Sequence, residues 1–400
     1  MNGGVAPVPD HVPAELIRDF DFFAFPGSDR DVHLAWKSIQ KEPPLFWTPR
    51  NGGHWVATRG RDIETIYGDS GRFSSRTESL PRDAAPFRQP PVEMDPPEHQ
   101  DYRRIITPEF SPRAMAGLEQ RARDLTIQLI AGFRDQGGCE FIRAFAKHMP
   151  IGIFLSVMKL PAEDAERLVP LAETKTRTGD VAVSYDVHRQ VLDYIAEKVE
   201  ERRRNPGDDL ISRTLAAEID GRRLRDEEVL AMCAVVMFAG LDTVVSSLGF
   251  IMRFLAENPA HRADLRNAPG LIPNAVDEML RRFSPTNLAR EAKADMVFGG
   301  VELKARDPIL LPTCLHGLDE HCWERPLVVD FQRRPILHLA FGTGAHRCIG
   351  SLLARTELRV MLSEWLPLIP EFEISPDMTV TTQSGQVYAV TSLPLSWAVN

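Results

Sequence analysis

The sequence predicts a mainly α-helical protein with a smaller β-rich part near its N-terminus. Apolar residues recur at helical spacing in most segments from about Leu16 onward, and no flexible linker, internal repeat or low-complexity tract separates them. Hydrophobic residues make up 43% of the 400-residue chain, which is enough to build one large core. We therefore expect a single domain over residues 1–400, with the β-rich part at about 40–75 and the helical part at about 95–370.

The β-rich part is predicted from a hairpin signal. Two runs rich in aromatic and β-branched residues, 45–47 and 54–58, flank a turn that contains an Asn-Gly pair. Asn-Gly between two such runs strongly indicates a hairpin. Short helices are expected at 32–40 and 62–67, and the proline-rich segment 81–97 is expected to be irregular.

Helical periodicity continues beyond this part of the chain. It predicts helices in four segments: 115–136, 142–158, 163–172 and 187–205. The segment 174–185 is polar and interrupts the pattern, so we expect a surface loop there, in a position to act as a mobile lid. Asp208 and Asp209 precede the next apolar segment and predict the start of a further short helix.

The longest periodic segment, 226–256, predicts a helix of 31 residues. At 1.5 Å per residue it spans roughly 46 Å and crosses the whole domain. Its middle carries Gly240, Asp242 and Thr243, and a threonine that bonds the carbonyl four residues earlier bends or opens a helix. The apolar flanks indicate that this turn is buried, and a buried carboxylate needs a reason. A polar pair that simply faces solvent is the alternative.

Cys348 lies in a glycine-punctuated loop, 341–350, and an apolar helix follows directly. Amide groups at a helix N-terminus lower the pKa of a thiol, which favours a thiolate. Gly342 and Gly344 allow the backbone to approach a large, flat group. A loop that binds haem iron as an axial ligand needs both a thiolate and a backbone that can approach the flat group closely. A free, buried cysteine at a helix start is the alternative.

Charge and cysteine content indicate the cellular setting. The net charge of −9 argues against nucleic acid as a partner. The five scattered cysteines argue against a disulfide framework and favour a reducing compartment. The N-terminal stretch holds prolines and acids, and no later window offers about 18–20 apolar residues free of charge. We therefore expect no signal peptide, no membrane anchor and a soluble, cytoplasmic protein.

A phenylalanine, two glycines, a basic residue two before the cysteine and a glycine two after it form the pattern at 341–350. This pattern resembles the haem-binding loop of the cytochrome P450 superfamily, the haem-thiolate monooxygenases. The resemblance implies the cytochrome P450 fold, a prism-like helical domain that encloses haem b with Cys348 as the iron ligand. Five further segments resemble the bacterial camphor hydroxylase subfamily: 51–55, 94–98, 240–245, 280–284 and 317–320.

The resemblance also implies a role for each matching residue. The haem propionates are bound by His99, Arg103, Arg290 and His346. Protons are delivered by Asp242 and Thr243, with Arg177 as a basic partner of the aspartate. A buried ionic cluster, which supports the fold, consists of Glu278, Arg281 and Arg333. The substrate is contacted by Phe87, Val235, Phe238, Thr286, Gln386 and Val387.

For two of these assignments, the neighbouring residues give a separate argument. His99 and Arg103 are four residues apart, so they share one face of a helix and can bind two anionic groups. Solvated charges at a capped helix start are the alternative for this pair. The family often has an acidic or polar residue two before the arginine at 290, where this chain has Leu288, so one hydrogen bond near a propionate is expected to be missing.

Differences from the camphor enzyme indicate a different substrate. Phe87 aligns with the tyrosine that anchors the camphor ketone, and Phe238 aligns with a valine of the pocket wall. We therefore expect a small hydrophobic terpenoid or an ionone-like norisoprenoid, with camphor bound poorly. Electrons are expected from a [2Fe-2S] ferredoxin with its NAD(P)H-dependent reductase, attracted by a basic patch of Arg103, Arg104, Arg334 and Arg347.

Other functions remain open at this point. The chain is alternatively a camphor hydroxylase proper, or a haem-based ligand sensor, although no output module is visible. A peroxide-driven peroxygenase of the same fold usually lacks the acid–alcohol pair that this chain has. A zinc site is a further alternative, since four potential ligands lie close in sequence: Cys314, His316, His321 and Cys322.

Overall fold

The computed structural model describes residues 5–82, 85–376 and 378–399. Residues 1–4 of the N-terminal stretch and 83–84 of the proline-rich segment, which the expectations above also cover, lie outside the described residues. A single cluster of buried apolar side chains extends from Val12 to Leu395 and joins the sheet to the helices. A mainly α-helical protein with a smaller β part is therefore confirmed.

The main sheet has five strands in the order β1-β2-β10-β7-β3. The predicted hairpin is present: β1 (Leu45–Thr48) pairs antiparallel with β2 (His54–Ala57), and Asn51 in the turn has a φ of 54°. β3 (Phe73–Ser74) lies at the far edge. Two of the three inner strands, β7 (Asn287–Ala292) and β10 (Pro308–Pro312), come from the region expected to be helical.

The β part is thus not confined to residues 40–75, which corrects the prediction. β10 runs parallel to β2 and antiparallel to β7, so the sheet is completed by residues more than 200 positions away in the sequence. Such pairing is long-range and leaves no local signal beyond short apolar runs.

The remaining strands are β4 (Gly138–Glu140), β5 (Glu218–Ile219), β6 (Arg222–Arg223), β8 (Met296–Phe298), β9 (Val301–Leu303), β11 (Glu373–Ile374), β12 (Thr381–Gln383), β13 (Ala389–Ser392) and β14 (Pro394–Ser396).

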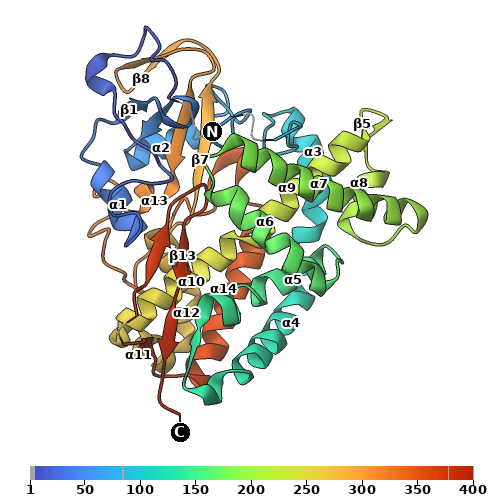
Figure 1. The fold of residues 1–400 in the computed structure, drawn as a ribbon, viewed down its shortest axis with the longest axis vertical. Helices are drawn as coiled ribbons and strands as arrows, with labels where there is room; N and C mark the ends of the chain where they lie inside the picture. The colour runs from blue at the N-terminus through green and yellow to red at the C-terminus, as the bar shows by residue number, and fades with distance from the viewer. Residues whose placement is uncertain (1–4, 83–84, 377, 400) are drawn as a thin grey trace.

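Three short helices accompany the main sheet: α1 (Val32–Ile39), α2 (Gly60–Gly68) and α13 (Thr313–Gly317). The others are α3 (Glu98–Ile106), α4 (Pro112–Ala131), α5 (Met149–Val157), α6 (Ala165–Arg177), α7 (Val181–Arg204), α8 (Leu210–Ala216), α9 (Asp226–Leu241), α10 (Thr243–Glu257), α11 (Pro259–Asn267), α12 (Ile272–Arg282) and α14 (Ser351–Leu368). Figure 1 shows the main sheet with α1, α2 and α13 at the upper left, and the larger helices to the right and below.

The predicted loop at 174–185 is wrong. α6 continues through Arg177 and α7 begins at Val181, which leaves only three linking residues. The polar side chains do not break the helix because Thr174 and Thr176 donate hydrogen bonds to the carbonyls of Pro170 and Ala172. The carboxylate of Asp180 then accepts from the first amides of α7 and caps it.

Other helix boundaries moved for similar local reasons. α4 begins at Pro112, before the expected start at 115, because the Ser111 hydroxyl accepts from the Ala114 amide and proline is well tolerated at the first helical position. The expected helix 142–158 is divided into a π-helical turn, Ile142–Ala146, and α5. As predicted, Asp209 caps the start of α8.

The long helix is confirmed as a central pair, α9 and α10, broken at Asp242, whose φ and ψ are −123° and −32°. α9 packs against α5, α6, α7 and α8, so it is covered along most of its length. By length and composition the stretch Asp226–Glu257, which Asp242 interrupts, is long and apolar enough to cross a membrane, the one such stretch among the described residues. Of its most apolar window, 67% is buried inside the protein, as in the core helix of a soluble protein.

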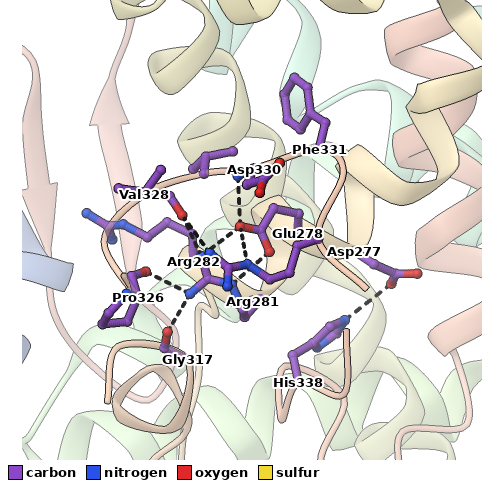
Figure 2. A network of polar contacts seen from close by, with 12 residues as sticks. Asp277, Glu278, Arg281, Arg282, Gly317, Pro326, Val328, Asp330, Phe331 and His338 are labelled. Atoms are coloured by element: carbon purple, nitrogen blue, oxygen red, sulfur yellow. Dashed lines mark hydrogen bonds and ion pairs between the residues drawn. The ribbon is translucent and has the colours of Figure 1, made fainter. Parts of the chain in front are cut away.

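α12 carries the predicted ionic cluster (Figure 2). The side chains of Glu278 and Arg281 are fully buried, and two hydrogen bonds of 2.8 Å join them. Arg333 donates to the same carboxylate at 3.1 Å, and so does the Asp330 amide at 3.0 Å. Arg281 also donates to the carbonyls of the segment that precedes the cysteine loop, at Gly317, Pro326 and Val328.

We expect Glu278→Ala to lower the stability by about 3–5 kcal/mol, because it leaves the Arg281 charge buried without a partner. The control is Glu257→Ala, which removes an exposed pair with Arg253 and should cost less than about 1 kcal/mol. Urea denaturation of both variants, followed by far-UV circular dichroism, measures the difference. Equal losses in the two variants would show that the cluster adds nothing beyond a surface ion pair.

Candidate active site

A cavity lies between the α9–α10 break and the cysteine loop. Its wall is built from segments far apart in the sequence: α2, α3, α6, α9, α10, β7, the loop and α14. All of the predicted haem-binding residues line it, namely His99, Arg103, Arg290, His346 and Cys348. So do Thr243 and five of the six predicted substrate residues, Val235, Phe238, Thr286, Gln386 and Val387.

The cysteine loop is held in a fixed shape. The Cys348 amide donates to the Phe341 carbonyl at 2.8 Å, and Gly342 has a φ of 63°, which favours glycine. A Cβ at Gly342 would also overlap the Tyr67 hydroxyl. Cys348 remains accessible to solvent and lines the cavity, so its sulfur is available to a bound group.

The predicted lowering of the Cys348 pKa is not observed. The sulfur is accessible only from the cavity that it lines, and desolvation by the surrounding protein raises the pKa of this thiol above its usual value. The Gly350 amide and the Arg103 and Arg355 charges oppose the shift only in part. The helix dipole is less effective than expected because α14 begins at Ser351, three residues after the cysteine. A positive charge at the sulfur, such as that of iron, would stabilise the thiolate.

Two histidines on the cavity wall have ring nitrogens without hydrogen-bond partners in the described part of the chain. Among the described residues, neither ring nitrogen of His99 has a hydrogen-bond partner, nor has Nε2 of His346. Their ring centroids are 4.2 Å apart. Burial lowers the pKa of His99 to about 4 and that of His346 to about 3, helped by Arg290 beside both, so both rings are neutral at pH 7.

Two arginines complete this part of the wall. Within the described part of the chain, neither Arg103 nor Arg290 has a carboxylate within 4.0 Å. Arg290 donates to the carbonyl of Ala289 and lies 4.4 Å from the Tyr67 ring centroid. Neutral histidines and unpaired guanidinium groups are suited to bind carboxylates. The residues present therefore fit a flat group with two carboxylates that offers a metal to Cys348, as haem b does.

Asp242 and Thr243 take different positions at the helix break. Thr243 lines the cavity and donates to the Ala239 carbonyl at 3.1 Å, as predicted. Asp242 is 1% exposed and points toward α6, where it accepts from Thr176 at 2.7 Å and pairs with Arg177 at 2.5 Å. Burial raises the pKa of Asp242, and the Arg177 charge and Thr176 oppose that shift.

Gly240 explains how the break is accommodated. A Cβ at this position would overlap the ring of Phe154 on α5, so the ring can pack directly against the α9 backbone. Gly240, Phe154 and Thr243 all line the cavity. The break therefore forms part of the cavity wall.

One predicted substrate residue lies elsewhere. Phe87 is 39% exposed and lines an outer pocket rather than the cavity that contains Cys348. The segment turns Gln89 inward instead, where its side chain donates to Glu93 at 3.1 Å and contacts His188 at 3.0 Å. These bonds fix Gln89 at the boundary of the two spaces, and Phe87 is directed away.

Several wall residues were not predicted from the sequence. Tyr67 packs beside Arg290, and Glu78 and Lys175 also line the cavity. Glu357 of α14 is 1% exposed, and burial raises the pKa of its carboxyl well above the usual value. A carboxylate within an apolar helix nine residues after Cys348 was a usable signal. Nothing in the local sequence marks the others.

The four potential zinc ligands do not form a site. Among the described residues, no group of three or more His, Cys, Asp or Glu side chains is placed to hold a metal ion. Cys314 lies on α13 and is fully buried, with its sulfur 3.6 Å from the Tyr388 hydroxyl.

Comparison with known proteins agrees with this geometry. The family description Cytochrome P450 matches residues 174–269 and 270–396. The chain belongs to the cytochrome P450 family, so it is a monooxygenase whose cofactor is haem b. Within the family it is of the CYP101 type: the crystal structures of CYP101J2 and CYP101C1 both match with a TM-score of 0.88, at 39% and 37% identity. Each alignment covers 98% of this chain and 100% of the other.

Curated relatives agree over nearly the same length. The probable cytochrome P450 127A1 of Sinorhizobium fredii is 35% identical over 407 aligned positions, covering 98% of this chain and 97% of the relative. The erythromycin C-12 hydroxylase of Saccharopolyspora erythraea is 33% identical, covering 85% of this chain and 88% of that enzyme. The resemblance to the camphor hydroxylase subfamily is thereby confirmed, and the ligand sensor is excluded.

We expect Cys348→Ala to abolish the strongly red-shifted Soret band of the reduced, carbon monoxide-treated protein, because that band requires a thiolate on the iron. The control is Cys139→Ala on β4, whose half-buried sulfur does not line the cavity. Absorption spectra of both variants make the comparison. An unchanged band in Cys348→Ala would assign the iron ligand to another residue.

Proposed function

We propose that this enzyme hydroxylates a small hydrophobic terpenoid or an ionone-like norisoprenoid, as a soluble cytoplasmic protein in which residues 1–400 act as one domain. The observation that supports it most is the apolar wall that the central helices present to the cavity of Cys348. Val235, Phe238 and Val244 come from α9 and α10, and Val387 comes from the C-terminal region. Such a wall favours a compact apolar substrate.

The chain's own residues would hold the cofactor and control protons. Haem b, bound through Cys348, supplies the iron at which O2 is activated for insertion into a C–H bond. His99, Arg103, Arg290 and His346 would bind its carboxylates. As a thiolate, Cys348 would push electron density toward a bound iron.

Asp242 and Thr243 would relay protons into the cavity. The Thr243 hydroxyl faces the cavity, and the adjacent Asp242 carboxyl reaches the other side of the helix. Asp242 is bound by Arg177 and Thr176 in this conformation. A proton relay through Asp242 therefore requires its bond to Arg177 to loosen, so Arg177 would gate the relay.

A ferredoxin is proposed as the electron donor because exposed arginines lie close to the cysteine loop. Arg347 belongs to the loop, and Arg104 has a side chain that is 76% exposed. Arg334, also exposed, contacts Asn274. On a chain of net charge −9, these charges would steer an acidic [2Fe-2S] ferredoxin to this face. Arg103 contributes less, since it is half-buried and bonded to the Arg347 carbonyl.

We expect Thr243→Ala to keep O2 consumption but to lower the hydroxylated product formed per O2 by about tenfold or more, with release of hydrogen peroxide, because a proton donor is lost. The control is Thr65→Ala, since Thr65, at an exposed position of α2, makes the same hydrogen bond to the carbonyl four residues earlier. Oxygen uptake, product and peroxide are measured with ferredoxin and reductase. Unchanged coupling would remove Thr243 from the relay, and equal turnover with peroxide alone would favour a peroxygenase.

We expect β-ionone, but not camphor, to produce a full low- to high-spin shift in the haem-loaded enzyme. No tyrosine occurs in the segment 81–97 to hold the camphor ketone, and Phe238, packed 4.7 Å from the His188 ring, changes the shape of the wall. Difference spectra with both compounds test this. A full shift with camphor and none with ionones would favour the alternative, a camphor hydroxylase proper.

A further inference from the structure

Lys175 stands at the boundary between two spaces. It belongs to α6 and is only 6% exposed. Its side chain lines the cavity of Cys348 and also the outer pocket that contains Phe87. Ser79 and Gln89 line both spaces as well. A charged side chain therefore borders the route between the outer pocket and an otherwise mainly apolar cavity.

In the described part of the chain, the Lys175 ammonium has no close partner. Among the described residues it makes no hydrogen bond, and no carboxylate lies within 4.0 Å of it. The charged residues near it are paired: Lys147 with Glu173 at 2.7 Å, and Arg177 with Asp242. A buried ammonium without an acceptor is costly, so its acceptor is expected inside the cavity.

The carboxyl groups of Glu78 and Glu93 interact electrostatically with Lys175, although neither lies within ion-pair distance of it. Glu93 accepts the amide and the side chain of Gln89, at 2.8 and 3.1 Å, so both of its oxygens are engaged. The carboxyl group of Glu78 lines the cavity and, within the described chain, makes no hydrogen bond or ion pair. The wall thus offers a donor, Lys175, and an acceptor, Glu78, that do not touch each other.

The charges around Lys175 and Glu78 indicate which kind of substrate oxygen fits between these two side chains. Near Lys175 there are already two carboxyl groups for one ammonium, and Arg290 faces the haem-binding part of the wall. A carboxylate on the substrate would add repulsion from Glu78 and Glu93. A neutral oxygen accepts from Lys175 without this repulsion, and a hydroxyl can also donate to Glu78.

We propose that Lys175 donates a hydrogen bond to a neutral oxygen, carbonyl or hydroxyl, at the end of the substrate next to the outer pocket. The inference rests on the proposed function and narrows it to oxygenated terpenoids or norisoprenoids. Lys175 is then a specificity-determining residue that orients the apolar remainder of the molecule toward Thr243 and Cys348.

The test is a set of spin-state titrations of the haem-loaded enzyme with four compounds of one carbon skeleton. They are β-ionone, the corresponding alcohol, the hydrocarbon with a methylene in place of the carbonyl, and a carboxylic acid of the same ring and chain length. The wild-type protein should bind the ketone and the alcohol about tenfold or more tightly than the hydrocarbon. In Lys175→Met this ratio should fall to about one, while hydrocarbon affinity is kept.

Lys41→Met, at an exposed turn, is the matched control and should keep the wild-type ratio. A ratio that survives in Lys175→Met overturns the proposal, as does a wild-type enzyme that binds the hydrocarbon as tightly as the ketone. The wild-type comparison decides this even if the variant fails to bind haem. If the carboxylic acid binds most tightly of the four compounds, the proposal of a neutral substrate oxygen is overturned. If none of the four compounds binds, the substrate class under the proposed function fails, and this assignment fails with it.

Discussion

Two adjacent carboxylates on α12 fix the chain on both sides of the cysteine. Glu278 holds Arg281 and Arg333, and through them the segment that leads into the loop. Asp277, the preceding residue, accepts from His338, which lies before Cys348, at 3.2 Å (Figure 2). It also accepts from Arg355, which lies after Cys348, at 2.7 Å. Because both contacts start from one rigid helix, the position of the sulfur is set by α12 rather than by the loop alone.

The cavity stays open because both of its walls are held in place. The cysteine loop is held by α12, and the opposite wall, formed by α9, is equally constrained. α9 is covered by α5, α6, α7 and α8, and the ring of Phe154 rests on Gly240. Close-packed interiors do not leave such a space open unless the surrounding elements are held apart. α6 contributes three consecutive side chains, Lys175, Thr176 and Arg177, to the substrate wall and to Asp242. One movement of α6 would therefore change substrate contact and the Asp242 carboxyl together.

Local sequence signals predicted elements whose cause is local. The Asn-Gly hairpin and the broken central helix were correct, because turn chemistry and threonine back-bonding act within a few residues. The segment 174–185 failed because polarity indicated a loop, whereas its threonines bond back to the helix. Strand β7 was missed because its partners include β3, which lies far away in the sequence.

The same division applies to the site. Cys348, Thr243 and the histidines were identified from motifs, since each motif places its residue on a particular element. Which side chains share a cavity depended on packing: Phe87 turned outward, and Tyr67, Glu78 and Lys175 turned inward. The sequence by itself determined the family and the cofactor, and it pointed to Cys348 as the proposed iron ligand. Only the tertiary structure decided the wall that faces the substrate and the raised pKa of the cysteine, because burial and long-range contacts arise when distant segments meet.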